Sequence, residues 1–95
     1  MEQDRAAMQT QIVIAEDSAV QAAILRRALE NHGYEVTWVK DGAAGLKLVR
    51  DLRPALVITD VEMPVMNGFE FCVAVKSNPE LTGIPVILCT SAAKP

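Results

Sequence analysis

The chain is poor in aromatic residues, in cysteine and in long apolar runs. Of its 95 residues only 4% are aromatic, and two are cysteines, Cys72 and Cys89. These thiols lack the C-x-x-C spacing, which favours reduced cysteines in a cytoplasmic protein over a disulfide or a metal site. No run approaches the ~18 apolar residues that span a bilayer, and residues 1–9 lack the basic-then-apolar order of a signal peptide. We therefore expect a cytoplasmic chain without a membrane segment.

Positive charge is also scarce. Nine Lys and Arg residues stand against twelve Asp and Glu residues, which leaves a net charge of −3 at pH 7. A surface that binds nucleic acid normally carries a basic stripe, so we expect no direct contact with nucleic acid. The length suits one domain with one core. We expect residues 1–10 to be a flexible leader and residues 11–95 to form the domain.

Short apolar runs alternate with amphipathic segments along the chain. The pattern predicts strands at 11–15, 34–39, 55–59 and 85–89, and helices at 19–31, 43–52 and 68–77. Strands that alternate with helices of this length predict an α/β fold, a doubly wound parallel sheet with helices on both faces. Apolar spacing gives two of the helices an expected buried side. In the first helix it comprises Val20, Ile24 and Ala28, with Leu25 and Leu29 beside them, and in the third it comprises Phe69, Cys72 and Val73 or a similar subset.

Two of the predicted strands end in acidic residues. Glu16 and Asp17 follow the first apolar run, and Asp60 ends the third, just before a loop marked by Pro and Gly. If these acids cooperate, the first and third strands must be neighbours, which favours the strand order 2-1-3-4. Ligands of such sheets bind beyond the carboxyl ends of the strands at the switch point, which here lies between these two strands.

Acids gathered at that edge predict a cation site. Neighbouring strands lie ~4.8 Å apart, so carboxylates of Glu16, Asp17 and Asp60 would repel one another or take up protons. Mg²⁺ accepts one or two carboxylates and keeps several waters, and the backbone carbonyl of Glu62 is a further candidate ligand. Asp60 would then be a nucleophile toward a phosphoryl group. Thr90, at the tip of the fourth strand, would offer its hydroxyl to a phosphoryl oxygen and act as a switch.

Together these residues resemble the response-regulator receiver domain of two-component signalling. The resemblance covers Ile12 through Ser91 and depends on Glu16-Asp17, on the pattern D-x-x-M-P-x-M-x-G that begins at Asp60, and on Thr90. It implies a flavodoxin-like fold and a phosphoacceptor rather than an enzyme, one that assists its own Mg²⁺-dependent phosphorylation and dephosphorylation. A histidine kinase or a phosphotransfer protein would supply the phosphoryl group to Asp60, and an output domain or downstream protein would respond.

The resemblance also implies the ligand set and a longer domain. Mg²⁺ would be held by Asp17, Asp60, the Glu62 carbonyl and, through water, Glu16. Receivers usually add a fifth strand that ends in a lysine and carries an aromatic, but only three residues separate Thr90 from Lys94. We therefore expect Lys94 to lie in a loop, and the fifth strand and last helices to be missing, as in a C-terminally truncated receiver. The bare edge of the fourth strand would then favour a homodimer or a domain swap.

Two other functions compete with this interpretation. A receiver-like protein-interaction module would act without phosphorylation, and a missing acid would favour it, whereas all three acids are present. A phosphohydrolase with an aspartyl nucleophile would carry a second Asp two residues after the first, but that position is Glu62.

Overall fold

Strands and helices alternate in the structure, a computed structural model that describes residues 10–90. The elements, in chain order, are β1 (Gln11–Ala15), α2 (Ala19–Glu30), β2 (Glu35–Val39), α3 (Gly42–Leu52), β3 (Leu56–Asp60), α4 (Gly68–Ser77) and β4 (Val86–Cys89). Every predicted strand and helix is found, each with ends within about a residue of the expected ones. The predicted leader, apart from Thr10, and Lys94 lie outside the described residues.

The four strands form one parallel sheet in the order β2-β1-β3-β4, as predicted. Ile14 of β1 pairs with Ile58 of β3, and Ala15 pairs with Thr59. Because these two central strands run parallel and in register, the residues that follow them emerge at one edge of the sheet. The fold therefore brings the acids after β1 and the acid at the end of β3 to the same place.

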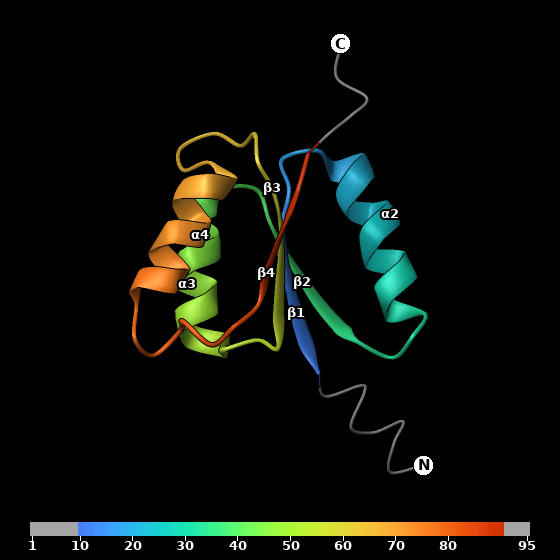
Figure 1. The fold of residues 1–95 in the computed structure, drawn as a ribbon. Coiled ribbons are helices and arrows are strands. Elements are labelled where there is room, and N and C mark those ends of the chain that lie inside the picture. Colours follow the sequence, from blue (N-terminus) through green and yellow to red (C-terminus); the bar gives the residue numbers. More distant parts are fainter. Residues whose placement is uncertain (1–9, 91–95) are drawn as a thin grey trace.

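Helices cover the two faces of the sheet unequally. Figure 1 shows α3 and α4 on one face and α2 alone on the other. The larger core cluster lies on the α3 and α4 side and consists of Val13, Ala15, Val49, Val57, Phe71, Val75 and Leu81. The smaller cluster lies under α2 and consists of Ile12, Ile14, Val36 and Ile58. Apolar burial on both faces holds the two central strands, and with them the acidic edge, in place.

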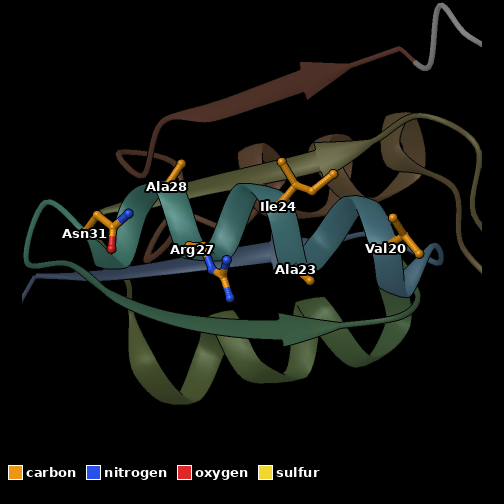
Figure 2. Close-up of a pocket in the computed structure, with 6 residues that line it drawn as sticks. All are labelled: Val20, Ala23, Ile24, Arg27, Ala28 and Asn31. Atoms are coloured by element: carbon orange, nitrogen blue, oxygen red, sulfur yellow. The ribbon is translucent and has the colours of Figure 1, made fainter.

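The expected buried side is partly wrong in α2 and wrong in α4. In α2 the side chains of Val20 and Ile24 are 70% and 67% exposed, and Figure 2 shows them on a side of the helix that carries a shallow apolar pocket. The helix packs on the sheet through Leu25 and Leu29, the two residues expected beside that side, and it lies mainly over β2 and β1. A sheet face with a single helix leaves that helix without a neighbour at its side.

In α4 the buried residues are Phe71 and Val75, whereas Phe69 and Val73 are exposed. The reason lies in the neighbouring helix. A Cβ atom at Gly45 of α3 would lie 2.9 Å from Cζ of Phe71, so the glycine makes room for this aromatic ring. Helix-to-helix packing thus selects a side of α4 that the apolar spacing alone does not identify.

Strand β4 is an edge strand within residues 10–90. Its Ile87 and Leu88 side chains are 48% and 37% exposed, and no further strand pairs with it in the described part of the chain. This agrees with the bare edge expected from the sequence, while association through that edge stays a prediction. None of the described helices is both long and apolar enough to cross a membrane.

Candidate functional site

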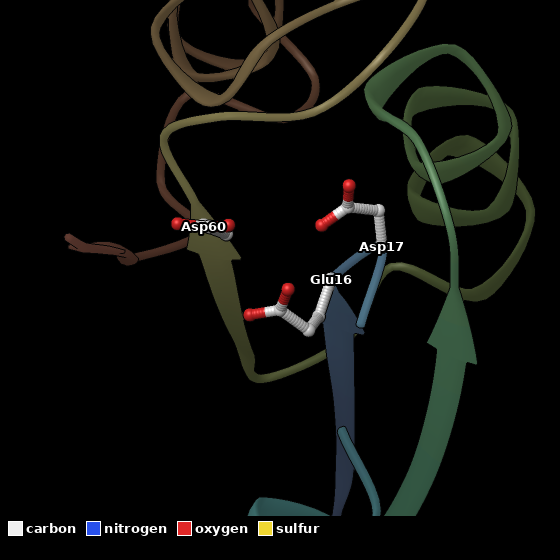
Figure 3. Close-up of side chains that lie close together, drawn as sticks. All are labelled: Glu16, Asp17 and Asp60. Atoms are coloured by element: carbon white, nitrogen blue, oxygen red, sulfur yellow. The ribbon is translucent and has the colours of Figure 1, made fainter. Parts of the chain in front are cut away.

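Three carboxylates meet at the carboxyl edge of the central strands. Asp60 is the last residue of β3 and is 4% exposed, while Glu16 and Asp17 follow β1 directly. Figure 3 shows the three side chains at the tips of these two strands. One oxygen from each carboxylate lies within 4.8 Å of the others. The structure thus brings together the three acids that the sequence places at two separate strand ends.

Backbone and side-chain hydrogen bonds hold the turn that carries Glu16 and Asp17. The Glu16 N–H donates to the carbonyl of Val39 in β2, at 3.0 Å. The indole Nε1–H of Trp38 donates to the Glu16 carbonyl at 2.6 Å. The Ser18 N–H donates to Oε2 of Glu16 at 3.0 Å, and Ser18 also caps α2. Nothing in the sequence distinguishes Trp38 from an ordinary sheet-packing residue, and its contact with this turn has no sequence signal.

A glycine at the start of α4 determines how closely the loop after β3 returns to Asp60. The Gly68 N–H donates to the Val61 carbonyl at 2.9 Å. A Cβ atom at Gly68 would overlap the Asp60 carbonyl oxygen and would lie 2.9 Å from Cα of Val61. Because both obstacles are backbone atoms, position 68 accepts no larger residue without a shift of the strand end. The glycine of the D-x-x-M-P-x-M-x-G pattern is therefore required by this close approach.

The acidic edge carries negative charge that the protein compensates poorly. Oδ2 of Asp60 is buried and has no hydrogen-bond partner in the described structure. Burial raises the pKa of Glu16, the negative charge of Asp60 adds to this effect, and the hydrogen bond from the Ser18 N–H opposes it. A buried polar oxygen without a partner is costly, and a cation at this edge would satisfy it. The available donors are carboxylate oxygens, which suit a hard cation such as Mg²⁺.

A shallow pocket extends this edge toward the loop after β3. It is lined by Asp17 and by the loop residues Val61, Glu62, Met63, Pro64 and Asn67. Glu62, whose carbonyl is a predicted ligand, therefore lies in the same depression as Asp17. Val65 in this loop has a φ of 68°, a strained value for a β-branched residue. Such outliers cluster at ligand sites and switch segments.

Thr90 follows directly after β4, whose last residue pairs with Asp60. Asp60 pairs in register with Cys89 of β4, and the Val61 N–H donates to the Cys89 carbonyl at 3.1 Å. Thr90 is the next residue along the chain and is exposed. It therefore stands one strand away from Asp60 at the carboxyl edge, where its predicted role as a switch hydroxyl stays a prediction.

These features define a doubly wound α/β domain with a cluster of three carboxylates at the switch point of its parallel sheet. The sequence matches the response regulator receiver domain over residues 12–95. The chain therefore belongs to the receiver-domain family.

Individual relatives agree with this family. The chain is 34% identical over 86 residues to the polar-differentiation response regulator DivK of Brucella anthropi, a match that covers 90% of this chain and 70% of DivK. It is 32% identical over 84 residues to the DNA-binding response regulator MtrA of Mycobacterium leprae, a match that covers 88% of this chain. The chain spans only 36% of the length of MtrA.

Solved structures share the fold. A receiver domain of a signal-transduction histidine kinase from Syntrophus aciditrophicus is 41% identical, with a TM-score of 0.83, and the match covers 90% of this chain and 65% of that one. The receiver domain of the sensor histidine kinase PA1611 from Pseudomonas aeruginosa is 25% identical, also with a TM-score of 0.83, over 88% of this chain and 69% of that one. That structure contains a magnesium ion coordinated in its active-site cleft.

Proposed function

We propose that the chain is a phosphoacceptor of two-component signalling. Asp60 would take a phosphoryl group from the phosphohistidine of a histidine kinase or a phosphotransfer protein, with Mg²⁺ bound beside it. An output domain or a partner protein would read the surface change that follows. The observation that carries this proposal is the buried Asp60 carboxylate, with an unpartnered oxygen, beside two further acids.

The chemistry requires a carboxylate that is accessible from one direction and held still. One Oδ atom of Asp60 would form the new P–O bond as the P–N bond of the phosphohistidine breaks. A phosphoimidazole that is protonated on its other nitrogen leaves as neutral imidazole, so the exchange needs no further proton. Burial of Asp60, which is 4% exposed, keeps bulk water away from the side chain. Bound Mg²⁺ would supply the charge cancellation that attack of one anion on another requires.

The residues that would hold the cation are Asp17, Asp60 and the Glu62 carbonyl, with Glu16 acting through a water molecule. The closeness of the three carboxylates supports this set, as does the pocket that Asp17 shares with Glu62. The magnesium ion in the PA1611 receiver domain adds support from a relative of the same fold. Thr90 would then offer its hydroxyl to the phosphoryl group from the neighbouring strand end.

Phosphorylation in vitro tests the proposal directly. We expect incubation with Mg²⁺ and acetyl phosphate to add the mass of one phosphoryl group, in a form that hydroxylamine removes. Asp60→Asn should abolish the gain, and EDTA should prevent it. Asp51→Asn is the matched control, because it makes the same chemical change at an exposed acid of α3 outside the cluster, and it should be modified like the wild type. A wild-type chain that binds Mg²⁺ and is never modified would instead favour the interaction module.

A further inference from the structure

We propose that Trp38 is a positioning residue for the cation site, and that its indole N–H sets the direction of the Glu16 and Asp17 side chains. This inference rests on the proposed function, because it assigns a role in cation binding to a residue that is not itself a ligand. Trp38 lies in β2, whereas the three acids lie at the ends of β1 and β3. Its contribution therefore passes through a single contact with the turn after β1.

That contact is a short hydrogen bond to the backbone. The distance from Nε1 of Trp38 to the Glu16 carbonyl oxygen is 2.6 Å, slightly shorter than the ~2.7–3.2 Å typical of N–H···O bonds. The next residue of β2, Val39, accepts a hydrogen bond from the Glu16 N–H at 3.0 Å. Two consecutive residues of one strand thus hold both polar backbone groups of Glu16, one through a side chain and one through a carbonyl.

The planarity of the peptide bond carries this restraint to Asp17. The Glu16 carbonyl and Cα of Asp17 belong to the same planar peptide unit. Fixing the carbonyl oxygen therefore fixes the plane from which the Asp17 side chain departs toward Asp60. Without the indole donor, that plane can rotate, and the closeness of the three carboxylates is no longer enforced. Residues that hydrogen-bond to metal ligands, without contacting the metal themselves, commonly affect metal affinity.

The indole ring is held independently of this hydrogen bond. Trp38 is half-buried and packs against the core cluster under α2, and it pairs in register with Ile14 of β1. The ammonium group of Lys40, just after β2, lies 5.7 Å from the ring centroid, close enough for a cation–π interaction. Packing of the ring thus orients the indole N–H before any cation binds. The indole therefore restrains the turn at Glu16, and the turn does not determine the position of the ring.

The competing explanation is that Trp38 only fills space under α2. The two roles can be separated because the 95 residues contain a single tryptophan. Supplying β-(3-benzothienyl)alanine to a tryptophan auxotroph replaces the indole N–H of Trp38 with sulfur and keeps the shape of the ring. Packing is preserved and only the donor is lost. Trp38→Phe serves as a second variant should the labelled chain fold poorly, and circular dichroism checks the fold of both.

The readout is divalent-cation affinity, measured for Mg²⁺ by calorimetry and for Mn²⁺ by the spin-resonance signal of the free ion. We expect loss of the N–H to weaken binding by about 10-fold, as for other partners of metal ligands. Tyr34→Phe is the matched control, because Tyr34 packs against the same cluster from the other end of β2 and should leave affinity unchanged. A purely structural role would lower the melting temperature in EDTA and leave the affinity of the folded chain as it was.

Equal affinity of the wild-type and benzothienyl chains would overturn the positioning role while leaving the proposed function intact. A wild-type chain that binds neither cation would overturn both proposals. Weaker binding by the benzothienyl chain with normal binding by Tyr34→Phe supports the role of the indole donor.

Discussion

Removing the charge of Asp60 should stabilise the chain when no divalent cation is bound. Oxygen atoms of the three carboxylates lie within 4.8 Å of one another, and two unit charges at that distance repel by about 1–2 kcal/mol at an effective dielectric constant of ~40–80. Asp60 is 4% exposed and Glu16 is half-buried, so water screens this pair least. Asp17 is exposed and adds little. We therefore expect Asp60→Asn to raise the free energy of unfolding in EDTA by about 1–2 kcal/mol.

Urea unfolding at pH 7 and low salt measures this effect. The wild type should be the less stable chain in EDTA and should gain stability with Mg²⁺, by about 2.7 kcal/mol at a concentration of 100 times Kd. Asp60→Asn should lose most of that gain. Salt should shrink the difference in EDTA, because it screens the repulsion. Asp51→Asn, the same change at an exposed acid outside the cluster, should show neither effect.

Two results would refute the reasoning. The first is an Asp60→Asn chain that is less stable than the wild type in EDTA, which would mean that the three carboxylates do not repel one another in the folded state. The second is a wild-type chain whose unfolding curve does not respond to Mg²⁺. The second result would also remove the support that the acidic cluster gives to the proposed function.

Three further predictions concern the same edge and its surroundings. Burial raises the folded-state pKa of Glu16 above its unfolded value, so the free energy of unfolding in EDTA should fall as pH rises from the unfolded pKa to the folded one. Mg²⁺ affinity should rise over the same pH interval, because Glu16 loses its proton there. Urea unfolding and calorimetry as functions of pH measure the two profiles, and Glu16→Gln should flatten both. Gly68→Ala should cost at least about 2 kcal/mol in urea unfolding, because its Cβ would overlap the Asp60 carbonyl, and an unchanged midpoint would contradict the close approach. The exposed Ile87 of edge strand β4 should promote association, so sedimentation should show oligomers that Ile87→Lys disperses; a monomeric wild type at high concentration would count against this.

Sequence reasoning predicts the backbone of this domain well because its signals are local. Each strand is a short apolar run, and each helix begins near a residue that caps it, as Ser18 does for α2. The order of the strands followed from chemistry rather than propensity. Cooperation of Asp60 with Glu16 and Asp17 requires β1 and β3 to be neighbours, which favours the order that the sheet has.

The errors concern contacts between elements that are far apart in the sequence. Phe71 rather than Phe69 is buried in α4 because Gly45 of α3 leaves space for its ring. Val20 on α2 is exposed because no second helix of the described residues lies beside α2 on its sheet face. The bond from Trp38 to the Glu16 carbonyl has no sequence signal at all, since it depends on how β2 sits beside β1. The spacing of apolar residues identifies the apolar side of a helix, but it does not identify which helix or strand packs against that side.

The pairing of β1 with β3 has a consequence for how the domain is made. Glu16 and Asp17 leave the ribosome before Asp60 does, and Asp60 joins them only when Ile58 has docked alongside Ile14. A nascent chain halted within α3 therefore offers nothing that would retain a divalent ion firmly. Ribosome-bound chains of increasing length should bind Mg²⁺ only once β3 has emerged. Magnesium binding would then report that β1 has paired with β3 during synthesis.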